Sequence, residues 1–331
     1  MLRTPKRFVR ILLALLLTAV CYLNFWSYSR QEQSSPDLFS DVAKGTAAAP
    51  QQYRILVVKV AWFLHAHTPL HMRHAFALLD TLAASVATFV LLRLLEQSEA
   101  FRKASPVAKW LGYFSYLFLC AFYLVWLTWY QRPETLPTAC FISLMVLLLS
   151  VRPTGLASRA GVVFATLGVA GLQALVRADV SVCVYAGVAL ATVMPLGRRL
   201  PMPRKLLLPL ATSAILLAAG VQWILMHRIY PHATYGDTAV FQLRFNLHPQ
   251  SLLTIAVFAA PVAWTAWISR KAYAQLDAPF LALLLGAAIF LPLWATVGRI
   301  QEVRIFLPFA LALAPLTATC ILRTVEAEPS A

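Results

Sequence analysis

The sequence predicts an all-α protein, a polytopic bundle of transmembrane helices, and three observations support this prediction. Of the 331 residues, 60% are hydrophobic, against about 45–50% in soluble domains. Only 12% are charged, which is about half the usual share. The apolar residues also occur in long runs, and about 20 of them form one bilayer-spanning helix. We therefore expect about ten spans in a single transmembrane domain, residues 1–331.

The first apolar run, residues 9–29, follows the basic residues Arg3, Lys6 and Arg7. A basic segment before an apolar run also begins a signal peptide, but this run is about 20 residues long and has no small-residue cleavage site. We therefore expect an uncleaved first span whose N-terminus lies inside, on the cytoplasmic side.

A polar segment follows the first span, and residues 30–73 are the predicted first external loop. Within it, the apolar run from Ile55 to Leu64 is interrupted by Lys59. A run of about ten residues is too short to cross a bilayer, so we expect an interfacial or a re-entrant segment.

Nine further apolar runs complete the predicted bundle, and residues 227–250 are expected to form a large external loop. An even number of spans places both termini on the cytoplasmic side. Most of the 28 Lys and Arg residues fall on that side, as basic residues do in the short cytoplasmic loops of membrane proteins. The remaining spans are expected at 74–92, 110–130, 135–151, 161–176, 180–197, 206–226, 251–268, 278–297 and 305–322.

The basic balance and the cysteines exclude two classes of protein. A net charge of +15 would favour nucleic acid as a partner of a soluble chain. Here the basic residues determine membrane topology, so no nucleic-acid partner is expected. The five cysteines are dispersed through apolar runs, and this spacing indicates neither a disulfide framework nor a zinc site.

Acidic residues in the first external loop are candidates for catalysis. Asp37 and Asp41 are four residues apart, so they would share one face of a helix. Paired carboxylates can supply a general base or a ligand for a divalent metal cation. Exposed carboxylates are also commonly just solvated.

Histidines are concentrated in the same loop, between residues 65 and 74. His67, His71 and His74 would align on one helical face, as zinc ligands can. Pro69 falls inside this register and indicates a bend. The alternative is an interfacial segment whose imidazoles meet lipid headgroups or a phosphate.

Arginines stand at the outer ends of four predicted spans, at positions 132, 177, 299 and 304. A guanidinium matches a phosphate group by its planar fork of donors. The alternative is local ion pairing, of Arg177 with Asp179 and of Arg299 with Glu302. Arg304 runs directly into an apolar segment, which favours a function for it.

Two further features are candidates for function. Asp80 lies inside a predicted span, where a charge is costly unless it has a partner or a role. The loop at 227–250 alternates aromatic with polar side chains, a pattern that suits either a sugar ring or a loop lying on lipid. Its alternating residues are Tyr230, Tyr235, Phe241 and Phe245 with Arg228, Asp237, Arg244 and His248.

This layout resembles the GT-C superfamily of polytopic membrane glycosyltransferases, which use polyprenyl-phosphate-linked sugar donors. Members carry an acidic catalytic motif in the first external loop, where Asp37 and Asp41 stand in this sequence. The segment from Gln301 to Pro308 resembles a late signature of membrane mannosyltransferases in the group. The likeness is topological across the whole chain and motif-level over two short stretches.

The resemblance implies an enzyme that transfers a sugar from a polyprenyl-phosphate donor to an acceptor on the outer face of a bacterial inner membrane. Its partners would be the lipid-linked donor and membrane lipids, with or without a divalent metal cation. The alternative is a transporter or flippase for an anionic or lipid-linked solute. Asp37 or Asp41 would act as general base, and the residues implied in substrate or phosphate binding are Arg54, Arg177, Glu302, Arg304, Tyr235 and Asp237.

Overall fold

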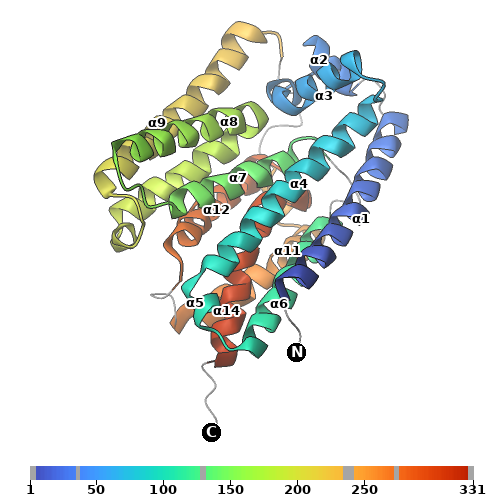
Figure 1. Cartoon of the computed structure of the whole chain (residues 1–331). Helices are drawn as coiled ribbons and strands as arrows, with labels where there is room; N and C mark the ends of the chain where they lie inside the picture. The colour runs from blue at the N-terminus through green and yellow to red at the C-terminus, as the bar shows by residue number, and fades with distance from the viewer. Residues whose placement is uncertain (1–4, 35–37, 127–131, 234–241, 272–275, 327–331) are drawn as a thin grey trace.

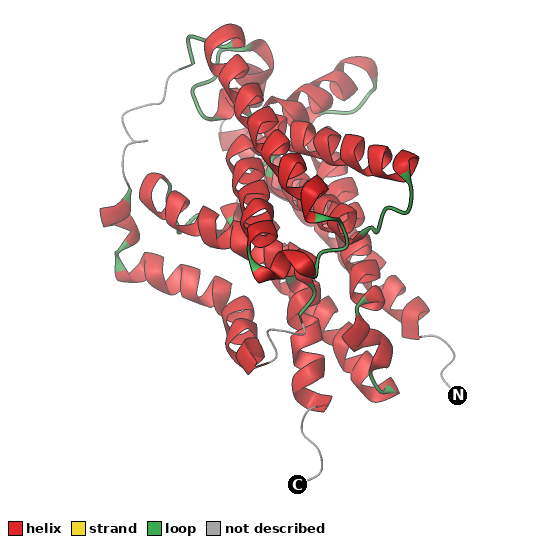
Figure 2. Cartoon of the chain, turned by 90° about the vertical axis from the view of Figure 1, so that its left-hand side faces the viewer, coloured by secondary structure: helices red, strands yellow, loops and turns green. Residues whose placement is uncertain are grey.

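A computed structural model describes residues 5–34, 38–126, 132–233, 242–271 and 276–326 of the chain. These residues form helices joined by short connections, and no strand occurs among them (Figure 2). The all-α prediction is therefore confirmed. The α-helices are α1 (Pro5–Ser34), α2 (Leu38–Lys44), α3 (Ile55–His67), α4 (Met72–Gln97), α5 (Glu99–Lys103), α6 (Pro106–Val125), α7 (Thr135–Ser150), α8 (Leu156–Val193), α9 (Arg204–Ile224), α10 (Leu243–Asn246), α11 (Pro249–Ile268), α12 (Ala278–Val297), α13 (Leu307–Ala312) and α14 (Ala314–Glu326).

Short helices of other types connect or extend these elements. They are the 3-10 helices η1 (Gln51–Tyr53), η3 (Pro195–Arg198), η6 (Ser269–Lys271) and η8 (Val303–Ile305), and the π-helix η4 (Leu225–Ile229). A π-helix widens the turn at the end of α9, and such turns are frequent at functional sites.

Seven of the described helices are long and apolar enough to cross a membrane, namely α1, α4, α6, α8, α9, α11 and α12. They support an integral membrane protein. The predicted ten spans do not appear as ten separate long helices among the described residues. The run at 135–151 gives α7, which has only 16 residues, and the run at 305–322 is divided between α13 and α14 around Leu313.

Helix α8 contains both of the runs predicted at 161–176 and 180–197. Its backbone leaves the helical region at Arg177 (φ −157°, ψ 92°). The Tyr185 hydroxyl donates to the carbonyl of Thr166 at 3.2 Å, although these residues would be about 28 Å apart in a straight helix. The Ser181 hydroxyl likewise donates to the carbonyl of Ala170 at 3.3 Å. The two arms of α8 therefore run antiparallel, side by side, and meet at Arg177.

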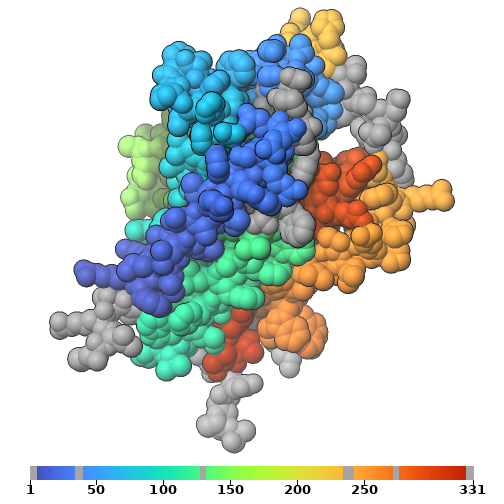
Figure 3. All heavy atoms as spheres, turned by 90° about the vertical axis from the view of Figure 1, so that its right-hand side faces the viewer, coloured from blue at the N-terminus to red at the C-terminus, as the bar shows by residue number. Residues whose placement is uncertain are grey.

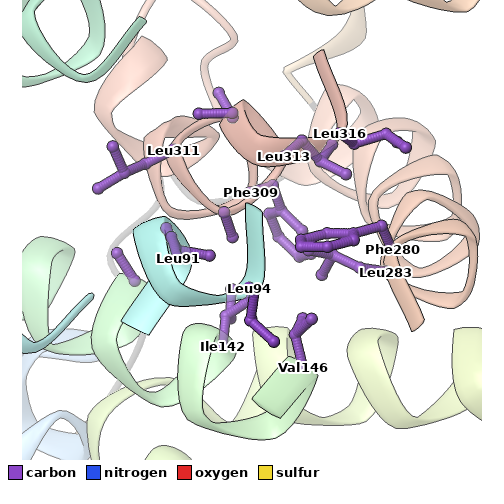
Figure 4. Packing of buried hydrophobic residues seen from close by; sticks show 14 of the residues in the cluster. Leu91, Leu94, Ile142, Val146, Phe280, Leu283, Phe309, Leu311, Leu313 and Leu316 are labelled. Carbon is purple, nitrogen blue, oxygen red and sulfur yellow. The ribbon is translucent and has the colours of Figure 1, made fainter. Parts of the chain in front are cut away.

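The core of the bundle lies where α4, α7, α12, α13 and α14 meet (Figure 4). Leu91 of α4, Ile142 of α7, Leu283 of α12 and Leu311 of α13 are all fully or almost fully buried there. Helices α9 and α11 are much less covered by the rest of the protein. Of an 18-residue apolar stretch in each helix, 28% is buried in α9 and 17% in α11. Such exposed apolar helix surface suits contact with lipid.

The second arm of α8 packs directly on α12. A side chain could not fit between them at Gly187, because a Cβ there would lie 2.3 Å from the backbone nitrogen of Gly286. This close approach brings Arg177 and the start of the second arm against Phe290 and Trp294 of α12.

The ends of the bundle differ in which elements they carry (Figure 1). Lys6 near the start of α1 pairs with Glu96 at the end of α4, and Arg323 near the end of α14 interacts electrostatically with Glu99 of α5. The start of the first helix and the end of the last helix therefore lie at the same end of the bundle, called the α5 end here. Helices α2 and α3 lie at the other, called the α2 end.

Candidate functional site

A cavity of about 170 Å³ at the α2 end collects charged side chains from three separate parts of the chain. We call it the charged cavity. Its walls come from the segment between α2 and α3, the approach to α7, and the stretch from α12 to η8. The lining residues are Val42, Pro50, Gln51, Arg54, Val58, Arg132, Pro133, Glu134, Trp294, Glu302, Arg304 and Ile305.

The segment before α3 is held in place by Gln52, which is fully buried. Its side-chain oxygen accepts from the backbone nitrogen of Ala47 at 2.9 Å, and its side-chain nitrogen donates to the carbonyl of Val42 at 3.2 Å. The neighbouring Tyr53 hydroxyl donates to the carbonyl of Ala233 at 2.7 Å. These contacts fix the backbone that presents Arg54 to the cavity.

Arg54 and Glu134 form the central ion pair of the charged cavity, with 2.6 Å between Nη1 and Oε1. The pair joins segments 80 residues apart, and both side chains are largely buried. Burial by itself would raise the pKa of Glu134, but Arg54, Arg132 and Arg177 hold that pKa below its ordinary value. Glu134 is therefore a carboxylate at neutral pH.

A second pair forms on η8, where Arg304 donates to Glu302 at 2.7 Å. The sequence suggested that Glu302 pairs with Arg299. Instead, the Arg299 guanidinium lies over the ring of Phe245, at 5.0 Å from its centroid. Arg304 keeps only 16% of its side chain exposed, so its charge is held at the cavity wall.

The tip of α8 carries a third pair. Arg177 is almost fully buried, and its guanidinium donates through two nitrogens to both carboxylate oxygens of Asp179. The same guanidinium lies 5.4 Å from the ring centroid of Phe290 and 5.1 Å from that of Trp294. The predicted local pair with Asp179 is present, and two aromatic faces add cation–π stabilisation.

A larger cavity of about 630 Å³ adjoins the charged cavity and shares Pro50, Arg54 and Trp294 with it. We call it the apolar groove, because most of its wall is hydrocarbon from α8, α9 and α12. Arg177 and Asp179 also line it. Its other lining residues are Tyr53, Ala178, Val182, Cys183, Ala218, Ala219, Gln222, Trp223, Met226, His227, Leu293 and Val297.

The two adjoining cavities together can bind an amphipathic anion. Their lining includes four arginines and three acidic residues, so arginines outnumber acids in the lining. Guanidinium groups in partly dry surroundings bind phosphate through bidentate hydrogen bonds. The groove beside them offers an apolar surface for a hydrocarbon chain. The four arginines are Arg54, Arg132, Arg177 and Arg304, and the acids are Glu134, Asp179 and Glu302.

Four of the predicted binding residues, Arg54, Arg177, Glu302 and Arg304, thus line two adjoining cavities. Sequence reasoning did not place Trp294 in the site, although this residue lines both cavities. It also did not pair Arg54 with Glu134. The Arg-Pro-Glu stretch at 132–134, between two apolar runs, was the available signal for Glu134.

The predicted catalytic residues, Asp37 and Asp41, are not among the described residues that line the two cavities. Asp41 lies on α2, where its carboxylate oxygen accepts from the Thr46 hydroxyl at 3.5 Å. It does not line the charged cavity, but the next residue, Val42, does. Asp37, Tyr235 and Asp237 lie outside the described residues, so their predicted roles stay predictions.

The histidines of the first loop do not share one helix. Helix α3 ends at His67, Thr68 is extended, and α4 begins after His71. The His67 ring stacks on Phe63, and the His74 ring stacks on Phe25. Within the described ranges, no three His, Cys, Asp or Glu side chains are grouped so that they could hold a metal ion.

Asp80, the acid predicted inside a span, is fully buried in α4. It accepts a hydrogen bond of 2.5 Å from the Tyr28 hydroxyl of α1. This contact gives the residue a partner within the helix bundle, and Asp80 lines neither the charged cavity nor the apolar groove.

Comparison with known proteins gives no relative for this chain: no protein family, no curated protein and no solved structure matches it.

Proposed function

We propose that this protein is a membrane glycosyltransferase of the GT-C type, which transfers a sugar from a polyprenyl-phosphate donor to an acceptor. One observation carries the proposal. Arginines from four separate segments line two adjoining cavities, one of which is an apolar groove among helices long and apolar enough to span a membrane. A lipid phosphate needs both features, a cationic site for the phosphate and a hydrocarbon surface for the chain.

In this proposal the arginines bind the donor phosphate and stabilise the charge that develops on it as the sugar leaves. Arg54 and Arg304 face the charged cavity, and Arg177 lies at the junction with the apolar groove. Their acidic partners hold the guanidinium groups in fixed positions, so little reorganisation is needed during the reaction.

The transfer forms a bond between the acceptor oxygen and the anomeric carbon, and it breaks the bond from that carbon to the phosphate oxygen. The anomeric carbon gains oxocarbenium character as polyprenyl phosphate leaves. Asp37 or Asp41 takes the proton of the acceptor hydroxyl as general base. Support for Asp41 is its place next to Val42, which lines the charged cavity.

The proposal also includes an orientation. The α2 end would face outward from a bacterial inner membrane, and the α5 end, with both chain termini, would face the cytoplasm. The exposed residues Arg102 and Lys103 and the half-buried Lys109 support this orientation, because basic loops remain on the cytoplasmic side.

The decisive test uses the full-length protein in phospholipid vesicles with undecaprenyl phosphate carrying a radiolabelled sugar. Native mass spectrometry would measure undecaprenyl-phosphate binding, and we expect Arg304→Gln to weaken it about tenfold or more. Arg159→Gln is the matched control, because Arg159 is an exposed arginine far along α8 from the cavity.

Transfer would be followed as release of undecaprenyl phosphate with label in a new glycan. Asp37→Asn or Asp41→Asn should abolish release without weakening lipid binding. Movement of the labelled lipid across the bilayer with no covalent product would instead establish the flippase. Equal binding by wild type and Arg304→Gln would exclude the phosphate site described here.

A further inference from the structure

A third cavity of about 540 Å³ lies beside the segment that carries Arg304. Its residues come from α10, the start of α11 and the loop before η8, and none of them lines the charged cavity or the apolar groove. Figure 3 shows α11 beside the last part of the chain on this face. The lining residues are Gln242, Arg244, Phe245, His248, Gln250 and Gln301.

The backbone segments that line this cavity are joined by Asn246, which is 2% exposed. The side-chain nitrogen of Asn246 donates to the carbonyls of Ala295 and Gly298 at 2.7 and 2.6 Å. The side-chain oxygen accepts from the backbone nitrogen of Ile300 at 2.9 Å. One buried amide thus joins α10 to the loop that leads to Arg304, so the site is held in shape without a ligand.

The lining has the chemistry of a carbohydrate site. Gln242, Gln250 and Gln301 each bring an amide that both donates and accepts, as sugar hydroxyls require. Phe245 is 42% exposed and offers an aromatic ring, which can pack on the apolar face of a sugar. Arg299 lies over that ring and holds it in position.

The position of the cavity relates it to the proposed donor site. Gln301 lines this cavity, whereas the next residue, Glu302, and its partner Arg304 line the charged cavity. The two sites are therefore separated by a single loop. A ligand bound here would have one end close to the arginines.

We propose that this cavity is a saccharide-binding subsite for the acceptor, formed by the amides of Gln242, Gln250 and Gln301 around the ring of Phe245. The assignment to the acceptor depends on the proposed function, whereas binding of a saccharide does not. The charged cavity lacks this group of amides and is suited to the phosphate instead.

The test measures binding of four trisaccharides to the purified full-length protein in nanodiscs by saturation-transfer difference NMR. The probes are chitotriose, maltotriose, mannotriose and tri-galacturonic acid, which differ in stereochemistry, acetamido groups and charge. We expect at least one to bind the wild type, and we expect Phe245→Ala and Gln301→Ala each to weaken it about tenfold or more.

Two controls define the site. Phe63→Ala removes another exposed phenylalanine, on α3, and should bind like the wild type. Arg304→Gln should also retain saccharide binding, because Arg304 does not line this cavity. Thermal melting of each variant would verify that it is folded.

The proposal is overturned if none of the four saccharides binds, or if binding survives both Phe245→Ala and Gln301→Ala. Saccharide binding by a protein that does not bind undecaprenyl phosphate would support this subsite and contradict the proposed function. Lipid binding without saccharide binding would contradict only the subsite.

Discussion

The two ends of the bundle differ in how deeply their ion pairs are buried. At the α2 end, Arg54 and Glu134 are largely buried and join segments far apart in the sequence. At the α5 end, Lys103 and Glu99 form a pair four residues apart, with 75% and 62% of their side chains exposed. Exposed pairs of this kind contribute little to stability, whereas a buried pair must have a compensating partner or function.

The carboxyl groups show the same difference. The pKa of Glu134 is lowered, because arginines in and near the charged cavity outweigh the effect of burial. The pKa of Asp277, at the start of α12, is raised, because the effect of burial outweighs the opposing effects of Arg323 and Arg199. Arg199 donates to the carbonyl of Leu276 instead. Concentrated arginine, rather than basic residues in general, is what distinguishes the α2 end.

The largest expected effect comes from breaking the buried pair. Arg54→Gln leaves the Glu134 carboxylate buried without its direct partner, and removal of one member of such a pair costs about 3–5 kcal/mol of the free energy of unfolding. Thermal melting in detergent would measure the loss. Arg159→Gln should have almost no effect, and an equal loss in both variants would contradict the structural role of the pair.

The next effect concerns the packing beneath the site. Gly187→Ala places a methyl group against the backbone of α12, and such overpacking costs about 1–3 kcal/mol. It should also weaken undecaprenyl-phosphate binding, because Arg177 depends on the contact of α8 with α12. Gly168→Ala is the control on the same helix, since its methyl group meets nothing within 4 Å. Equal stability of the two variants would exclude the close approach.

A smaller effect is expected in the dependence of stability on pH. The folded-state pKa of Glu134 lies below the ordinary value of 4.5, so its contribution is fully present above that value and is lost as the pH falls through the folded pKa. In Glu134→Gln, the melting temperature should therefore fall less steeply as the pH is lowered than it does in the wild type. An equally steep fall in both proteins would show that Glu134 is not held as a carboxylate.

Asp277 should respond in the opposite direction. Its folded-state pKa is raised above 3.8, so the charged form destabilises the fold at neutral pH and protonation relieves this as the pH falls. Asp277→Asn should raise the melting temperature slightly at neutral pH and lose that advantage in acid. A lower melting temperature at neutral pH would contradict the assignment.

The smallest effect is expected for the exposed pair at the α5 end. Glu99→Gln removes a charge from a fully solvated surface, so its melting temperature should equal that of the wild type within error. A clear loss would show that the two ends are more alike than their burial indicates.

The sequence predicted the helices better than it predicted their contacts. The run at 278–297 coincides with α12 (Ala278–Val297), and the run at 251–268 lies within α11 (Pro249–Ile268), because apolar composition over about 20 residues determines a span. The reversal at the tip of α8 falls between the runs predicted at 161–176 and 180–197, where only three residues separate the two. The Arg54–Glu134 pair depends on tertiary packing across 80 residues, which periodicity does not contain.

In the candidate site, too, the sequence predicted local contacts but not contacts between distant segments. Local sequence indicated the pairing of Arg177 with Asp179, because only Ala178 stands between them in the chain. The resemblance grouped Arg54, Arg177 and Arg304 as binding residues. Local sequence alone does not show that they line adjoining cavities, since only folding brings three distant segments together. Asp37, Tyr235 and Asp237 lie beyond the described part of the chain, and their roles remain predictions.

The hairpin form of α8 has a mechanical consequence. Both arms meet at Arg177 without an intervening loop, and hydrogen bonds from Ser181 and Tyr185 fasten one arm to the other. The two arms are therefore coupled to each other near the tip, and the second arm packs on α12. A ligand that displaces the Arg177 guanidinium would therefore displace both arms of α8 together.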